Sequence, residues 1–198
     1  MPPDFSAAVD ADAADILITN KSNIYSKRKG QFIMRPRNIV VGFGCNSGTQ
    51  AEEIEDAVNR IFDENNLSFS ALHSIATLDK KGKEPGLIAF AGKHNIKVSV
   101  FAPEELNSVK GISRSEAAFR ATGANAVAEP AALLAAGAGR LLLKKQKSGN
   151  VTIALAEIKG HGEELMKREK DATEQHTGRI YIVGTGPGDM KHITPLAQ

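Results

Sequence analysis

The sequence predicts a three-layer α/β fold: a mostly parallel or mixed sheet of about five strands with helices on both faces. Short apolar runs alternate with segments whose apolar residues recur at helical spacing, as in successive βαβ units. A content of 41% apolar and 24% charged residues suits a globular core. Strands are expected at 38–43, 73–78, 97–101, 140–143 and 151–156, and helices at 48–65, 84–94, 113–121 and 128–137.

The chain divides into four regions. Residues 1–35 are expected to be the tail of an upstream region or a linker, 36–158 the main domain, 159–178 a charged linker, and 179–198 the start of a second domain. The first region contains one strand-like run, Ile16 to Thr19. Because a lone strand is not stable, it should pair with a missing segment or dock on the main domain as an edge.

The main domain opens with the clearest strand–turn–helix unit of the sequence. An apolar run leads into GFGCNSG, residues 42–48, which is expected to form a tight turn. Thr49 is expected to cap the following helix, with Glu52 three residues later as in a capping box. An apolar stripe then recurs at helical spacing: Ile54, Ala57, Val58, Ile61 and Phe62.

The glycine-rich run does not fit a dinucleotide site. Its spacing is G-x-G-x-x-x-G, and the acidic residue that ends the next strand, Asp79, comes too late in the sequence. The backbone amides at the helix start instead predict an anion site in an open crevice at the sheet edge. The candidate binding residues are Gly44, Cys45, Asn46, Ser47 and Thr49.

Cys45 leaves two interpretations open. A thiol near a helix N-terminus can have a lowered pKa, which a nucleophile needs. The alternative is a small packed residue, and no arrangement of Cys, His and Asp in the sequence argues independently for a thiol nucleophile.

A second loop also follows a strand and opens a helix. It contains Asp79, Lys81 and Glu84, which should lie at the carboxyl edge of the sheet beside the first turn. A carboxylate there could act as a base toward water, and the lysine could stabilise a substrate carboxylate or an oxyanion. These three are the candidate catalytic residues. The alternative is a solvated loop with a charged helix cap.

A third polar group surrounds the alanine-rich helix at 128–137. Glu129 stands at its start, either as a capping carboxylate or as a binding residue. Lys144, Lys145 and Lys147 follow the next strand. They are expected to form a basic hairpin turn or a positive rim for a polycarboxylate ligand, and Lys144 and Lys147 are the binding candidates.

Composition excludes several classes of function. The chain has 198 residues, with 25 basic and 23 acidic side chains, so no nucleic-acid partner is expected. One cysteine excludes an internal disulfide framework, and the five histidines lack metal-ligand spacing, so no bound metal is expected. The acidic N-terminus has no signal sequence, and the longest apolar stretch, 131–143, is too short for a bilayer. A cytoplasmic protein without a membrane partner is expected.

Three stretches together are more specific than any one alone: NIVVGFGCNSGTQAEEIEDAV, TLDKKGKEPGLIAFA and TGANAVAEPAALLAAGAGRLLLKKQKSGNVTIALA. Over residues 36–158 their order and spacing resemble the C-terminal domain of cobalamin biosynthesis protein G, the CbiG/CobE family. The last region, through YIVGTGPGD, resembles the opening of tetrapyrrole methylases such as precorrin-3B C17-methyltransferase. Its truncated S-adenosylmethionine-type motif contains Gly184, Gly186, Pro187, Gly188 and Asp189.

The first resemblance implies a cobalt-precorrin-5A hydrolase domain, which opens a δ-lactone and releases acetaldehyde. Water attack on the lactone needs a base and oxyanion donors. Our hypotheses are Asp79 or Glu84 as the base, Lys81 as the electrostatic partner, and the backbone amides around Cys45 to Ser47 as the donors. The resemblance also implies no cofactor in the main domain, since cobalt is carried by the corrinoid substrate. S-adenosylmethionine belongs only to the missing methylase, and further partners are other cobalamin biosynthesis enzymes.

Two features depart from the family pattern. The N-terminal domain of the family's full enzyme is absent, and Asn46 and Ser47 stand where many members carry basic residues. A second hypothesis therefore remains: a non-catalytic domain that binds the corrinoid intermediate and passes it to an attached precorrin methyltransferase. A third, an unrelated nucleotide-binding domain, is disfavoured by the glycine spacing.

Overall fold

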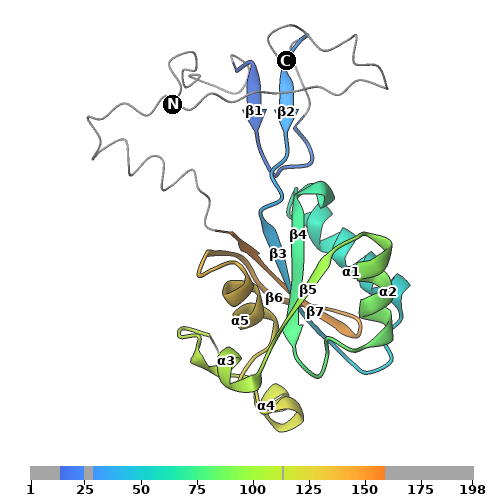
Figure 1. Cartoon of the computed structure of the whole chain (residues 1–198), viewed down its shortest axis with the longest axis vertical. Helices are drawn as coiled ribbons and strands as arrows, with labels where there is room; N and C mark the ends of the chain where they lie inside the picture. The colour runs from blue at the N-terminus through green and yellow to red at the C-terminus, as the bar shows by residue number, and fades with distance from the viewer. Residues whose placement is uncertain (1–13, 25–28, 113, 159–198) are drawn as a thin grey trace, which may run out of the picture.

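A computed structural model describes residues 14–24, 29–112 and 114–158 of the chain (Figure 1). The predicted charged linker at 159–178 and the predicted second domain at 179–198 lie outside these residues. The same is true of the glycine-rich motif residues Gly184, Gly186, Pro187, Gly188 and Asp189.

The main domain is built on a five-stranded mixed sheet with the strand order β5-β4-β3-β7-β6. The three strands β3 (Ile39–Cys45), β4 (Leu72–Leu78) and β5 (Lys97–Phe101) are parallel. β7 (Val151–Glu157) runs antiparallel to β3, and β6 (Arg140–Ser148) runs antiparallel to β7. The predicted fold class is confirmed.

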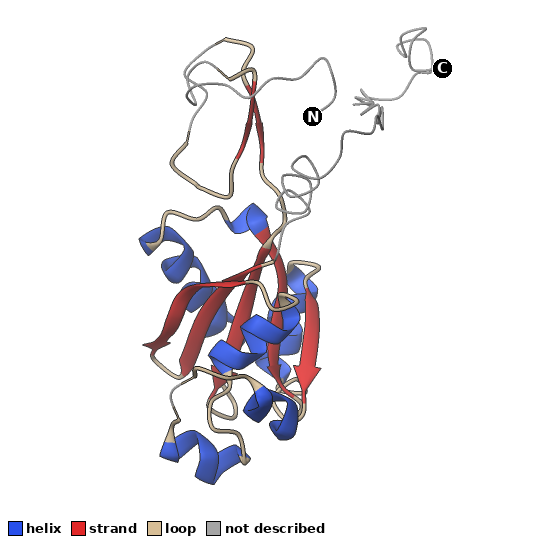
Figure 2. Cartoon of the chain, turned by 90° about the vertical axis from the view of Figure 1, so that its left-hand side faces the viewer, coloured by secondary structure: helices blue, strands red, loops and turns tan. Residues whose placement is uncertain are grey.

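Helices cover both faces of the sheet (Figures 1 and 2). On one face, α1 (Ala51–Glu64) and α2 (Pro85–Lys93) bury an apolar core with side chains such as Phe43 and Phe62. On the other, α5 (Ala128–Ala135) and α3 (Pro103–Ser108) enclose a second, alanine-rich core around Val40. Two further helices are a short 3-10 helix at Phe69–Ala71 and α4 at Glu116–Thr122.

Alternation along β3 divides its residues between the two cores. Val41, Phe43 and Cys45 contribute to the α1 face, whereas Val40 contributes to the α5 face. Gly42 also faces α5, because a Cβ built on it would lie 1.8 Å from the carbonyl oxygen of Ala128. Helix α5 can therefore lie on the central strand only because residue 42 has no side chain.

Some predicted boundaries were wrong. The first half of GFGCNSG is not a turn, because β3 continues through Cys45. The N-cap of α1 is Gln50 and not Thr49, whose hydroxyl donates to the carbonyl of Asn46 at 2.8 Å. The helix predicted at 113–121 begins three residues later as α4, and α3 was not predicted at all. The errors at α3 and α4 arise because these helices are short, so that few turns repeat the helical spacing.

The N-terminal strand finds its partner within the described chain. β1 (Ile16–Ile18) pairs in parallel with β2 (Phe32–Met34), a strand that the sequence analysis did not predict. These two strands form a sheet of their own, above the main sheet in Figure 1. The segment after β1 contacts the loop between α1 and β4, where Ser22 donates its amide to Asn66 at 3.1 Å.

In the described part of the chain, no helix has the length and apolar character needed to cross a bilayer.

The contact between β3 and α5 gives a testable prediction. Gly42→Ala should lower the free energy of unfolding by about 3 kcal/mol, because the added methyl group overlaps the Ala128 carbonyl and α5 must shift. Denaturant unfolding followed by circular dichroism measures the change. The matched control is Gly44→Ala, whose Cβ would meet only the Thr152 Cβ at 3.9 Å and should change stability by less than about 1 kcal/mol. Equal stabilities of the two variants would contradict this account.

Candidate functional site

The parallel strands end at one edge of the sheet, which we call the carboxyl edge. The turn that follows β3, residues 46–50, and the loop that follows β4, residues 79–84, both leave from it. In open α/β sheets, ligands bind in the crevice outside this edge. The structure therefore brings together two of the segments that the sequence analysis selected.

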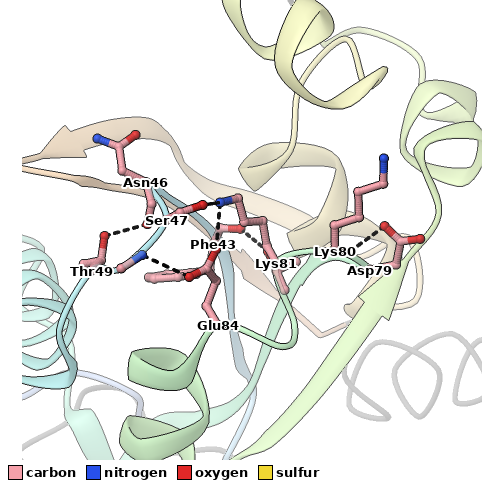
Figure 3. Close-up of polar contacts among 10 residues, drawn as sticks. Phe43, Asn46, Ser47, Thr49, Asp79, Lys80, Lys81 and Glu84 are labelled. Carbon is pink, nitrogen blue, oxygen red and sulfur yellow. Dashed lines mark hydrogen bonds and ion pairs between the residues drawn. The ribbon is translucent and has the colours of Figure 1, made fainter.

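Lys81 and Glu84 join the two segments (Figure 3). Lys81 Nζ donates to Ser47 Oγ and contacts Glu84 Oε1, both at 2.9 Å. The second carboxylate oxygen, Glu84 Oε2, accepts the backbone N–H of Gly48 at 3.1 Å. We call Ser47, Gly48, Lys81 and Glu84 the lysine cluster. Its contacts fix the turn after β3 against the loop after β4.

The lysine cluster keeps Glu84 ionised. The hydrogen bond from Lys81 and then the Gly48 N–H lower the pKa of the Glu84 carboxyl, while partial burial opposes them. The side chains of Lys81 and Glu84 are 20% and 14% exposed. A carboxylate with a lowered pKa and both oxygens engaged is a weak base. The geometry therefore suits Glu84 to positioning Lys81 better than to activating water.

Asp79 lies apart from this cluster. Its Oδ1 accepts the backbone N–H of Lys80 at 2.6 Å, and its side chain is exposed. Figure 3 shows Asp79 and Lys80 directed away from Ser47, Lys81 and Glu84. The three predicted catalytic residues are thus divided into an ion pair and a separate, solvent-facing carboxylate.

Cys45 is a packed thiol. It is half-buried against the α1 core, and burial raises the pKa of its thiol. The charge of Lys81 and a hydrogen bond with Thr49 lower that pKa, and the charge of Glu84 raises it, but burial dominates. Because a nucleophilic cysteine needs the thiolate, these surroundings favour the interpretation as a packed residue.

Two other predicted binding residues shape the turn. The backbone N–H of Asn46 donates to the Asn150 carbonyl at 3.0 Å, and its side-chain amide donates to Asn150 Oδ1 at 2.8 Å. Thr49 is only 6% exposed, and a Cβ on Gly86 would lie 2.1 Å from its carbonyl oxygen. Asn46 therefore links the turn to the β6–β7 hairpin, and Thr49 is enclosed by the start of α2.

Glu129 connects α5 to the edge of the sheet. It is 6% exposed, and its Oε1 accepts the backbone N–H of Lys145 at 3.0 Å. The β6–β7 pairing shifts register between Leu143 and Gln146, so the residues between them have irregular ladder bonds. Glu129 stabilises this irregularity from the first turn of α5, a role that the sequence did not indicate.

The predicted basic turn at Lys144 to Lys147 was wrong. These lysines lie within β6, which continues to Ser148, and the hairpin turn is Gly149 and Asn150. Both Lys144 and Lys147 are exposed on an edge strand. Lysines are common on sheet edges because they oppose pairing with another chain. Lys147 is nevertheless opposite Thr152, which in turn is opposite Gly44.

Gly44, Thr152 and Lys147 thus form a row across three neighbouring strands, which we call the glycine row. Gly44 follows Gly42 by two residues and faces α5, whereas Cys45 faces α1. The sequence analysis missed Thr152, because only the β3–β7 register places it beside Gly44. The candidate binding residues therefore lie on two different faces of the sheet.

Within the described residues, no group of three or more His, Cys, Asp or Glu side chains is arranged to ligate a metal ion.

Residues 39–156 match the family described as "Cobalamin synthesis G C-terminus". The chain is 40% identical to a cobalt-precorrin-5A hydrolase of Priestia megaterium over 126 residues, which are 64% of this chain and 34% of that protein. It is 33% identical to Protein CobE of a Sinorhizobium species, over 60% of this chain and 79% of that protein. The chain thus spans about a third of the hydrolase relative but most of the CobE relative.

A solved structure is similar as well. The crystal structure of CobE, a protein from the cobalamin biosynthetic pathway, superposes with a TM-score of 0.56 at 35% sequence identity. The match covers 61% of this chain and 89% of that one.

The lysine cluster predicts a pH-dependent contribution to stability. Because the pKa of Glu84 is lowered on folding, its contribution should be complete above the ordinary value of 4.5 and disappear as the pH falls through the lower folded value. Glu84→Gln should therefore cost about 1 kcal/mol of unfolding free energy at neutral pH. Urea unfolding from neutral pH to below 4.5 should show the wild-type advantage shrinking. The exposed Glu64→Gln is the control, and an advantage that grows on acidification would contradict the assignment.

Cys45 can be tested by its reactivity. As the only cysteine in the chain, it can be alkylated unambiguously with iodoacetamide. The midpoint of the rate–pH profile should lie above the ordinary pKa of 9.0, because burial disfavours the thiolate. The unfolded chain in denaturant is the reference. A folded-state midpoint below that reference would restore the interpretation as an activated nucleophile.

Proposed function

This chain belongs to the family of the cobalamin synthesis G C-terminus, and from that premise we propose that it is the domain of a cobalt-precorrin-5A hydrolase that binds the corrinoid at the carboxyl edge of its sheet. The observation that carries the proposal is the 40% identity over 126 residues with the hydrolase of Priestia megaterium. The family match at residues 39–156 includes the lysine cluster. The carboxyl edge carries Lys81, whose side chain is 20% exposed, and a positive charge there suits a substrate rich in carboxylates.

The proposed reaction is hydrolysis of the δ-lactone followed by loss of acetaldehyde. The oxygen of water bonds to the lactone carbonyl carbon, and the bond from that carbon to the ring alcohol oxygen breaks, which leaves a carboxylate and an alcohol. The alcohol then loses its proton, its carbon–carbon bond to the macrocycle breaks, and the ring carbon takes up a proton. The two-carbon fragment leaves as acetaldehyde. The step needs a base and a group that stabilises the oxyanion.

The geometry favours one distribution of these roles. Asp79 is the better candidate for the base, since its side chain is exposed and, among the described residues, accepts a hydrogen bond from the neighbouring Lys80 backbone amide. Lys81 is the candidate for oxyanion or carboxylate stabilisation, and Glu84 positions it. The amides of Asn46 and Gly48 are already engaged, which weakens the expectation that this turn supplies oxyanion donors.

A second candidate function follows from the CobE relatives. The structural match with CobE covers 61% of this chain and 89% of the CobE chain. A protein of this family can therefore consist of little more than the domain that the two share. The alternative is accordingly a corrinoid-binding domain that passes the intermediate to another cobalamin biosynthesis enzyme, such as an attached precorrin methyltransferase. In both proposals the site needs no cofactor, cobalt arrives with the substrate, and S-adenosylmethionine concerns only the methylase. Both also place the protein in the cytoplasm.

Acetaldehyde release separates the two functions. The purified chain mixed with cobalt-precorrin-5A should release acetaldehyde above the background without enzyme, measured by coupling to alcohol dehydrogenase and NADH. A change in the corrinoid absorbance without aldehyde would identify the binding domain instead. Absence of both signals would contradict the two proposals together.

The assigned roles can be tested by substitution. Asp79→Asn should lower the rate of acetaldehyde release by about 100-fold, as expected for loss of a general base. Lys81→Met should weaken substrate binding as well as the rate, because it removes the positive charge. The control is Asp63→Asn, an exposed aspartate in the last turn of α1. A rate unchanged by Asp79→Asn would exclude Asp79 as the base.

A further inference from the structure

Few atoms lie over Gly44, the residue of the glycine row on the central strand. A Cβ built on Gly44 would meet only the Thr152 Cβ, at 3.9 Å, which is ordinary contact. Two residues earlier, a Cβ on Gly42 would overlap the Ala128 carbonyl. Helix α5 therefore begins beside Gly42. It does not cover the surface at Gly44, which lies two residues closer to the carboxyl edge on the same face of β3. Gly44 and Thr152 are both partly exposed.

The row has dimensions and charge that suit a flat anionic ligand. Neighbouring strands lie about 4.8 Å apart, so Gly44, Thr152 and Lys147 extend across roughly 10 Å of sheet. Lys147 supplies an exposed positive charge at the outer end. The first turn of α5 lies beside Gly42, two residues before Gly44. Glu129 in that turn is 6% exposed and accepts the backbone N–H of Lys145.

The opposite face of the carboxyl edge is already occupied by internal contacts. Lys81 is engaged with Glu84 and Ser47, and Glu84 with Gly48. Cys45 and Thr49 are packed there. A macrocycle that engaged Lys81 from that side would compete with Glu84 and Ser47, whereas a ligand over Gly44 and Thr152 would leave these contacts in place.

We propose that the corrinoid ring lies on the α5 side of the sheet, with its plane over Gly44 and Thr152 and one peripheral carboxylate paired with Lys147. This inference rests on the proposed function and adds the face of the sheet that takes the substrate, together with Thr152 as a binding residue. In this proposal, a side chain at position 44 would obstruct the ligand but would not disturb the fold.

Binding of cobyrinic acid tests the proposal, because this corrin carries free carboxylates and is stable in air. An absorbance titration with the full chain measures the dissociation constant. Gly44→Val should keep the fold and weaken binding by about tenfold or more, since its methyl groups occupy the space over the row. Lys147→Glu should weaken binding by about threefold, and the effect should decrease at high salt.

Two matched controls accompany these variants. Gly92→Ala adds a methyl group on α2 where a Cβ meets nothing within 4 Å. Lys97→Glu reverses an exposed lysine on β5, the opposite edge strand. Both should bind cobyrinic acid like the wild type. If Gly44→Val fails to fold by circular dichroism, Gly44→Ala and Lys147→Glu decide the question.

The outcomes separate this inference from the proposed function. Loss of binding in the Gly44 and Lys147 variants, with unchanged controls, supports the α5-side position. Wild-type affinity in a folded Gly44→Val and in Lys147→Glu overturns that position and leaves corrinoid binding intact. No binding by the wild-type chain overturns the corrinoid proposal and this inference with it.

Discussion

The contact between Gly42 and the first turn of α5 determines how closely this helix packs against the central strand of the sheet. The backbone of α5 lies against the central strand, where even a methyl group would overlap the Ala128 carbonyl. This contact places an alanine-rich helix within reach of β3, β4 and β7 at once. Because α5 begins at this level, the strand surface beyond it, at Gly44, remains accessible.

The central strand also separates two kinds of polar environment at the carboxyl edge. On the α1 side, Ser47, Lys81 and Glu84 satisfy one another and connect consecutive loops of the sheet. On the α5 side, the glycine row carries an exposed lysine without a comparable network. Because side chains alternate along β3, Cys45 packs against the α1 core while the neighbouring Gly44 lies on the α5 face.

The match to the cobalamin biosynthesis family covers one part of the chain. The family match covers residues 39–156, the part that contains the five-stranded sheet, both helical layers and the carboxyl edge. The β1–β2 sheet lies outside that match, and the segment that follows β1 contacts the module through Ser22, which donates its amide to Asn66. The chain spans about a third of the length of the hydrolase relative from Priestia megaterium.

The sequence alone determined the fold class, most strands, the first helix and the family, because these depend on periodic burial and on ordered motifs that a linear pattern records. Only the tertiary structure decided that β3 runs through Cys45, that β1 pairs with β2, and that Lys81 and Glu84 form a pair apart from Asp79. Thr152 becomes a neighbour of Gly44 through the β3–β7 register alone. Such contacts join residues far apart in the chain, and local helix and strand propensities do not say which residues of two distant strands lie opposite each other.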